Sequence, residues 1–127
     1  MAKPMGIYSS TQQYVVRAGM VRASTLIAGT TPHRDMRELT GFSVQSAPGV
    51  SVDELTRGGQ FLNPKISVTT RARLQWYGFK IVFPTPGKGR YHATVQAPYP
   101  LPPDLAEDLS RLFDQYPNPY PVRKQGR

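Results

Sequence analysis

The 127-residue chain contains no cysteine. No disulfide, thiolate zinc site or cysteine nucleophile is therefore possible. The chain also lacks the run of about eighteen apolar residues that a membrane-spanning helix needs, so we expect no membrane partner. Its first ten residues, MAKPMGIYSS, have no apolar core of a secretory signal. We expect that any export relies on a larger carrier or a secretion apparatus.

Carboxylates are missing from a long central stretch. The net charge is +8, and from Leu55 to Pro103 the chain has seven Lys and Arg residues but no Asp or Glu. A field of one sign attracts polyanions, so the charge predicts a polyanionic or strongly acidic partner, with general solubility or a basic genome as the alternative. Metal-dependent nucleases hold their ion with carboxylates or histidine clusters. We therefore predict no metal and no cofactor.

The residue pattern predicts one α+β domain over residues 1–127, with flexible tails at 1–12 and 117–127. Alternating and β-branched runs predict an antiparallel sheet of four or five strands. These strands are expected at 13–17, 41–45, 65–70, 79–83 and 91–97.

Helices are expected near the N-terminus and at the C-terminal end of the sheet. Residues 18–29 fit a short helix, and Ser51 followed by Glu54 fits a capping box for a helix at 52–57. A short helix capped by Thr69 or Thr70 is expected to run to Trp76. An amphipathic helix is predicted at 103–115, where Leu105, Leu109, Leu112 and Phe113 follow helical spacing.

The stretch PTPGKGRYHATVQAP, residues 84–98, carries one of the two histidines of the chain. On an alternating strand His92 and Thr94 share a polar face, which we expect to lie outside the core. An imidazole both donates and accepts protons near neutral pH. Lys88 and Arg90 beside it are suited to holding a phosphate. An inert, solvent-exposed strand face is the alternative.

A second group of hydroxyl and basic residues lies in KISVTTRARLQW. Hydroxyls beside arginines bind phosphate oxygens, so this run predicts a substrate-binding surface. Its residues, with one aromatic from the next run, are Lys65, Ser67, Thr69, Thr70, Arg71, Arg73 and Tyr91. Helix capping by the threonines and packing by the tyrosine remain alternatives.

Metal-free cleavage of a phosphodiester is easiest when the substrate supplies its own nucleophile, as RNA does through its 2′-OH. A general base, a general acid and a few cations then suffice. We predict a metal-independent ribonuclease, with His92, Lys88, Arg90, Thr94 and Arg17 as its catalytic residues. An ordinary role at the end of a strand is the alternative for Arg17.

Three stretches carry a resemblance to known proteins: TGFSVQSAPGVSVDELTRGGQF, ISVTT and GKGRYHATVQAPYPLPPDLAEDLSRLF. They resemble the C-terminal toxin domains of bacterial polymorphic toxin systems, in the style of contact-dependent inhibition, Rhs and type VI effectors. The resemblance implies a toxin used in bacterial competition and neutralised by an acidic immunity protein. It also implies delivery from a producing bacterium into the target cell cytoplasm, on a carrier or through a secretion apparatus.

Two activities are common on such domains. The metal-independent ribonucleases of the barnase–EndoU–colicin–RelE type place helices before an antiparallel sheet, and His92, Lys88, Arg90, Thr94 and Thr69 match them by residue type.

The other activity is NAD-dependent ADP-ribosyl transfer. Its Arg and Ser-Thr-Ser elements correspond to Arg17 and to SVTT at 67–70. Its Glu has no clear counterpart, because no Glu lies between Glu54 and Glu107. A basic module that binds nucleic acid without catalysis is a third alternative.

Overall fold

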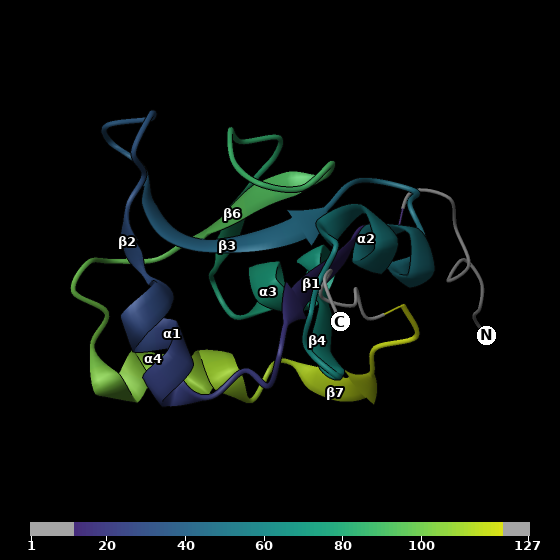
Figure 1. The fold of residues 1–127 in the computed structure, drawn as a ribbon. Coiled ribbons are helices and arrows are strands. Elements are labelled where there is room, and N and C mark those ends of the chain that lie inside the picture. The colour runs from purple at the N-terminus through teal and green to yellow at the C-terminus, as the bar shows by residue number, and fades with distance from the viewer. Residues whose placement is uncertain (1–11, 121–127) are drawn as a thin grey trace, which may run out of the picture.

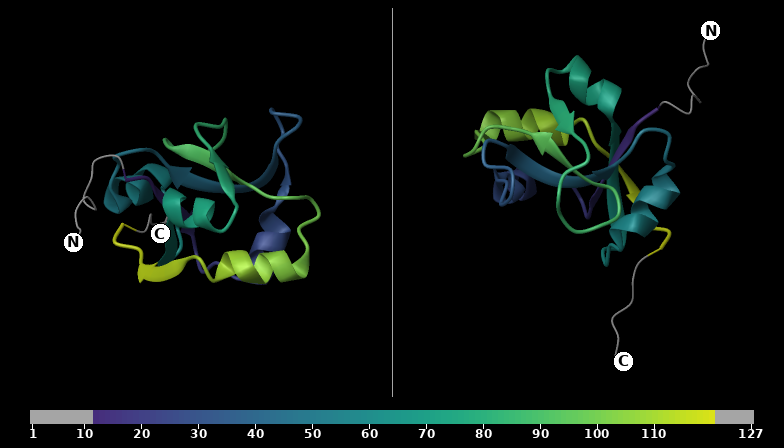
Figure 2. Two further views of the ribbon diagram at one scale, coloured as in Figure 1. Left: turned by 180° about the vertical axis from the view of Figure 1, so that it is seen from behind. Right: turned by 90° about the horizontal axis from the view of Figure 1, so that it is seen from above.

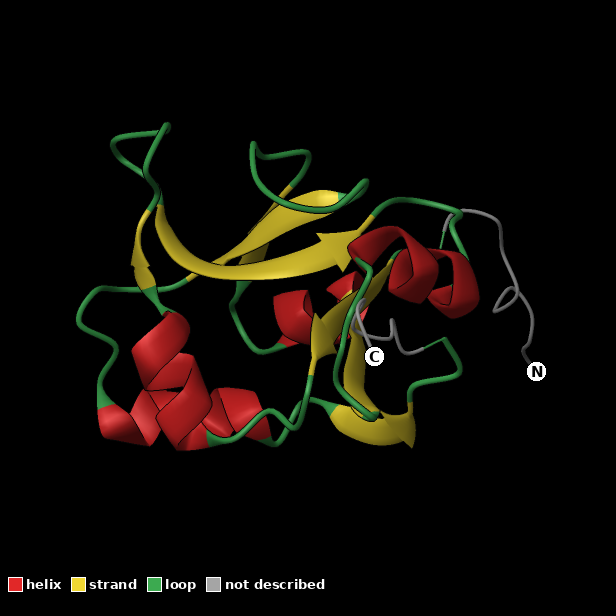
Figure 3. Ribbon diagram, in the orientation of Figure 1, coloured by secondary structure: helices red, strands yellow, loops and turns green. Residues whose placement is uncertain are grey.

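An antiparallel sheet forms the centre of the fold (Figure 1). The computed structural model describes residues 12–120, which contain seven strands and four helices. In chain order these are β1 Tyr14–Ala18, α1 Ala23–Gly29, β2 Thr31–Pro32, β3 Thr40–Ser46, α2 Val52–Gly59, β4 Lys65–Thr70, α3 Arg71–Trp76, β5 Lys80–Val82, β6 His92–Gln96, α4 Pro103–Ser110 and β7 Asp114–Pro117. The predicted α+β class is confirmed, because helices are interspersed along the chain with the strands of an antiparallel sheet. Figure 3 shows the helices packed beside the sheet.

The sheet has more strands than the four or five predicted. Its order is β5-β6-β3-β1-β4-β7, and β2 pairs with β3. The additional strands are β2 and β7, and β7 occupies the end of the predicted helix 103–115. That helix stops at Ser110, and Asp114–Pro117 instead pairs with the edge of β4. The strand includes Pro117, so the predicted tail at 117–127 begins inside the sheet, and its residues 121–127 lie outside the described ones.

The first helix begins later than predicted. Ala18 still belongs to β1, and residues 19–22 connect it to the helix, with a φ of 76° at Gly19. The Ser67 hydroxyl fixes this turn, because it accepts a hydrogen bond from the Val21 N–H at 2.9 Å and donates one to the Gly19 carbonyl at 2.8 Å. The chain turns here before the helix begins at Ala23. Of the predicted tail at 1–12, residues 1–11 lie outside the described ones.

The helices cover the two faces of the sheet. Val15 belongs to a core cluster that includes Leu26 of α1 and Leu109 of α4, whereas Val16 belongs to a second cluster with Leu55 of α2. Neighbouring residues of a strand point to opposite faces, so α1 and α4 cover one face and α2 the other. Figure 2 shows α1 and α4 packed side by side.

The two central strands of the sheet separate partway along their length. The pairing of β1 with β3 comprises Val15 with Ser46 and Val16 with Gln45. Beyond these pairs Arg17 continues along β4, whereas the first half of β3 continues along β6. The sheet therefore forks after Val16, and the fork opens a cleft between its two arms. Within residues 12–120, no helix has the length and apolarity needed to cross a bilayer.

Candidate functional site

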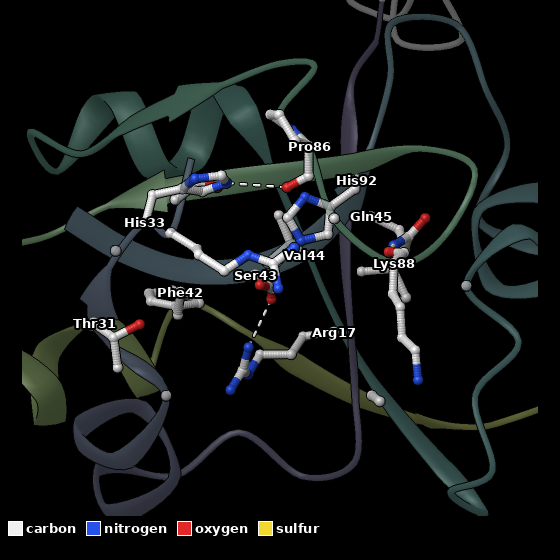
Figure 4. A pocket seen from close by; sticks show the side chains of 18 of the residues that line it. Arg17, Thr31, His33, Phe42, Ser43, Val44, Gln45, Pro86, Lys88 and His92 are labelled. Atoms are coloured by element: carbon white, nitrogen blue, oxygen red, sulfur yellow. Dashed lines mark hydrogen bonds between the residues drawn. The ribbon is translucent and has the colours of Figure 1, made fainter. Parts of the chain in front are cut away.

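A cleft of about 650 Å³ lies at the fork of the sheet (Figure 4). This volume is within the range of roughly 300–1,000 Å³ that small-molecule and cofactor sites occupy. Its walls come from the end of β1, the segment from Gly29 to Asp35, β3, the end of α2 with Phe61, and the turn Pro86–Lys88. Segments far apart in the sequence thus meet at one concave surface.

Arg17 spans the fork. Its Nη1 donates a hydrogen bond to the Ser43 carbonyl on the opposite arm, at 2.6 Å, and its guanidinium carbon lies 5.2 Å from the centre of the Phe42 ring (Figure 4). The side chain is partly buried, and burial lowers the pKa of the Arg17 guanidinium below its ordinary value. An arginine nevertheless stays cationic at neutral pH. Among residues 12–120, no carboxylate forms an ion pair with it.

His92 lies in the wall of the cleft but is buried, with 8% of its surface exposed. This corrects the prediction that its polar strand face lies open. The turn before β6 folds back over the strand, with the Thr85 N–H donating to the His92 carbonyl at 2.9 Å. Gly87 lies against the imidazole so closely that a Cβ at this position would overlap with Cε1 and Nε2. The alternation of the strand was right, but a loop covers its polar face.

Both nitrogens of the His92 ring are hydrogen-bonded within the protein. Nδ1 lies 3.0 Å from the Thr85 carbonyl oxygen and 2.9 Å from Thr85 Oγ1, and Nε2 lies 3.0 Å from Ser43 Oγ. A carbonyl only accepts, so this contact is a hydrogen bond when Nδ1 carries the proton. In that tautomer Nε2 accepts a hydrogen bond from the Ser43 hydroxyl.

Ser43 is a residue of the site that was not predicted. Its side chain is exposed at the cleft, and it is the group through which the buried imidazole reaches the cleft surface. The alternation in GFSVQ places Ser43 and Gln45 on one strand face, and Gln45 pairs with His92 across the sheet. This strand pairing is what would have identified Ser43, and a single sequence does not show which strands are neighbours in the sheet.

His33 joins the two loops at the mouth of the cleft. Its Nε2 donates to the Pro86 carbonyl at 3.0 Å, and its Nδ1 accepts the backbone N–H groups of Asp35 and Met36 at 3.0 and 3.1 Å (Figure 4). Its ring centre lies 6.5 Å from that of His92. The contacts tie the loop after β2 to the turn before β6.

The other predicted catalytic residues divide between the cleft and its surroundings. Lys88 and Thr94 line the cleft, Lys88 exposed and Thr94 buried. Arg90 does not line it, because its Nη1 lies 3.6 Å from Glu54 Oε2 on α2. Tyr91 donates to the same carboxylate oxygen at 3.1 Å. Arg90 is thus engaged with α2 and does not join Lys88 as a second phosphate ligand in the cleft.

The hydroxyls of β4 support the fold around the cleft. Ser67 is fully buried and holds the turn after β1 through the two bonds already described. Thr70 caps α3 by accepting the Arg73 N–H at 3.1 Å, as the alternative interpretation expected. Thr69 is buried, and its Oγ1 has no hydrogen-bond partner within the described residues.

The basic residues of the same run lie outside the cleft. Lys65 is exposed at the start of β4, and Arg71 donates to Oε1 of Gln13 at 3.1 Å. Arg73 lies 3.6 Å from Asp114 of β7. These three basic residues therefore do not line the cleft that contains Arg17 and His92.

No group of three or more His, Asp or Glu side chains in the described part of the chain is arranged to hold a metal ion. No protein-family model matches the chain, no curated protein is significantly similar to it, and no solved structure matches it. Its chemistry must therefore be inferred from the cleft itself. That cleft offers Arg17, a cation with no ion-pair partner in the described part of the chain, a second cation at Lys88, and the Ser43 hydroxyl, which is hydrogen-bonded to an imidazole.

Proposed function

We propose that the protein is a toxin domain that consumes NAD, breaking the bond between nicotinamide and ribose in the cleft around Arg17. The observation that carries the proposal is the position of Arg17, which is partly buried at the fork and has no carboxylate partner among residues 12–120. A buried charge is costly unless it is paired. A pyrophosphate bound in the cleft supplies the missing anion through charge-assisted hydrogen bonds.

The shape of the cleft also favours a nucleotide of limited size. Its volume suits a small molecule, and Phe42 and Phe61 give it apolar walls beside the cations. Lys88 adds positive charge on the far side. A nucleic-acid strand, in contrast, needs a basic groove that follows its backbone, and the basic residues of β4 and α3 lie elsewhere.

The reaction with water as acceptor balances as follows. The C–N bond between ribose C1′ and nicotinamide breaks, and its electron pair goes to nicotinamide. The oxygen of a water molecule bonds to C1′ and loses a proton. The Ser43 hydroxyl, bound to His92, lies in the cleft where it can relay that proton to the imidazole. The cleft carries Asp35, which pairs with Arg34 at 3.7 Å, and no glutamate. We take water as the acceptor, because the reaction then balances without a second substrate.

The test incubates the purified protein with NAD and total bacterial RNA in one tube containing EDTA. We expect NAD to fall and nicotinamide to rise while the RNA stays intact. Arg17→Lys removes the planar, bidentate donor but keeps the charge, and should lower kcat/KM for NAD by about tenfold or more. Arg37→Lys, on the exposed loop after β2, is the control. RNA fragments with NAD unchanged would refute the proposal.

A ribonuclease is the second candidate, because His33 and His92 approach within 6.5 Å at a cationic cleft. Two imidazoles beside a phosphate supply the acid and the base that RNA cleavage needs. NAD is favoured because every ring nitrogen of this pair is already hydrogen-bonded to the protein. The same tube distinguishes the two activities. For either one, we propose that an acidic immunity protein protects the producing bacterium.

A further inference from the structure

Ser43 and His92 form a hydroxyl–imidazole pair whose geometry suits proton transfer. Ser43 Oγ lies 3.0 Å from His92 Nε2, within reach for direct proton transfer. The hydroxyl is exposed at the cleft, whereas the ring beneath it is buried. The serine hydroxyl therefore connects the imidazole to a group bound in the cleft.

The imidazole is held in one orientation by a third group. The Thr85 carbonyl lies 3.0 Å from Nδ1, and Gly87 covers the face of the ring. A base within hydrogen-bond reach of a hydroxyl, itself oriented by a third group, is the arrangement that activates a nucleophile. The carbonyl also stabilises the imidazolium that forms when Nε2 takes the serine proton.

We propose that Ser43 is a nucleophile and that His92 is its general base. Ser43 Oγ bonds to the electrophilic atom of a substrate, the bond from that atom to its leaving group breaks, and the serine proton moves to Nε2. Arg17 and Lys88 select electrophiles that carry a phosphate or carboxylate group. This activity is a transfer onto the protein itself, and it does not depend on NAD being the substrate.

A single cysteine tests the pair without disturbing the buried ring. The chain has no cysteine, so Ser43→Cys carries one thiol. With iodoacetamide its sulfur bonds to the methylene carbon, iodide leaves, and the thiol proton goes to His92. Ser24→Cys is the matched control, because Ser24 is exposed on α1 and bonds to neither histidine.

We expect the thiol of Ser43→Cys to be alkylated about tenfold faster than that of Ser24→Cys at pH 6, where an unassisted thiol is almost fully protonated. The double variant Ser43→Cys/His92→Gln should lose most of that advantage if it remains folded. The wild-type protein should take up one sulfonyl group from phenylmethanesulfonyl fluoride, mapped by mass spectrometry to Ser43, and Ser43→Ala should take up none there. Equal alkylation rates for the two thiols, or a wild-type Ser43 that stays unmodified, would overturn the inference.

The same samples separate this inference from the proposed function. If the protein releases nicotinamide from NAD but Ser43 is unreactive, the proposed function is supported and the assignment of Ser43 as a nucleophile is refuted. If Ser43 reacts with the sulfonyl fluoride but NAD stays intact, the assignment of Ser43 as a nucleophile is supported and the NAD proposal is refuted.

Discussion

The Arg17 guanidinium lies directly against Gly29, the last residue of α1. A Cβ on Gly29 would lie 2.5 Å from Arg17 Nη2, so alanine there must displace the guanidinium. The guanidinium is the end of a flexible side chain, and alanine is up to about 1 kcal/mol better than glycine in a helix. We expect Gly29→Ala to keep or raise the melting temperature and to lower kcat/KM for NAD about tenfold.

The control for this variant is Ser24→Ala, which changes the same helix away from the cleft. It should leave both the melting temperature and the kinetics nearly unchanged. Full activity in Gly29→Ala would mean that the guanidinium position does not matter, and the NAD proposal would lose its main support.

Two buried threonines test the role of hydrogen bonding in the interior. Thr69 Oγ1 has no partner among residues 12–120, whereas Thr56 Oγ1 donates to the Val52 carbonyl at 2.7 Å. Valine keeps the shape and removes the hydroxyl. We expect Thr69→Val to raise the free energy of unfolding by about 1 kcal/mol and Thr56→Val to lower it by about 1 kcal/mol. Urea denaturation measures both, and a destabilised Thr69→Val would show that this hydroxyl has a partner.

Residue identity predicted part of the site. The predictions named Arg17, Lys88, His92 and Thr94, and all four line the cleft. Arg90 and Arg73 were predicted as well, but they do not line the cleft. Each lies beside a carboxylate, and the sequence does not show which cations a carboxylate pairs with in the fold. Ser43 was missed because its importance depends on a strand pairing and on a loop that buries the imidazole.

At the scale of elements, α2 is fastened to the start of β6 by Glu54 and Tyr91. Burial first, and then the hydrogen bond to Glu54, raise the pKa of Tyr91 above its ordinary value. The folded state thus favours the neutral phenol. This contribution to stability is fully present below the pKa of an unfolded tyrosine, about 10, and is lost as the pH rises through the higher folded value.

We therefore expect the free energy of unfolding to fall as the pH rises above about 10, and to fall less in Tyr91→Phe, which has no proton to lose at that position. Denaturation at a series of pH values from 8 to about 11 measures the difference. Parallel curves for the two proteins would contradict the shift. Tyr99→Phe, at an exposed position far from α2 in the sequence, is the control.

The elements show what local pattern predicts and what it cannot. The strand expected at 65–70 is confirmed residue for residue, because its β-branched residues favour a strand and the Thr70 cap begins the next helix directly after it. The strand β7 was missed because DQYP has little β-pattern and forms through pairing with β4, about fifty residues earlier. The fork likewise depends on pairing between distant strands.

At the scale of the whole molecule, we expect the net charge of +8 to govern binding of polyanions to the surface, and the cleft to govern binding and reaction of NAD. Exposed cations such as Lys65 and Lys80 lie on different strands of the sheet and attract any polyanion. Such attraction is screened over about 10 Å at 0.1 M salt. The partly buried Arg17 is screened much less, so salt should separate surface binding from chemistry in the cleft.

We expect RNA to be retained at about 50 mM salt and released at several hundred millimolar, because binding through phosphates releases counterions. The double variant Lys65→Glu/Lys80→Glu should weaken RNA binding and flatten its salt dependence, yet leave kcat/KM for NAD within about twofold of the wild type. Filter binding and nicotinamide release, measured on the same samples, give both quantities. If NAD consumption falls in parallel with RNA binding, the surface charge guides the substrate to the cleft, and the basic stretch between Leu55 and Pro103 then contributes directly to catalysis.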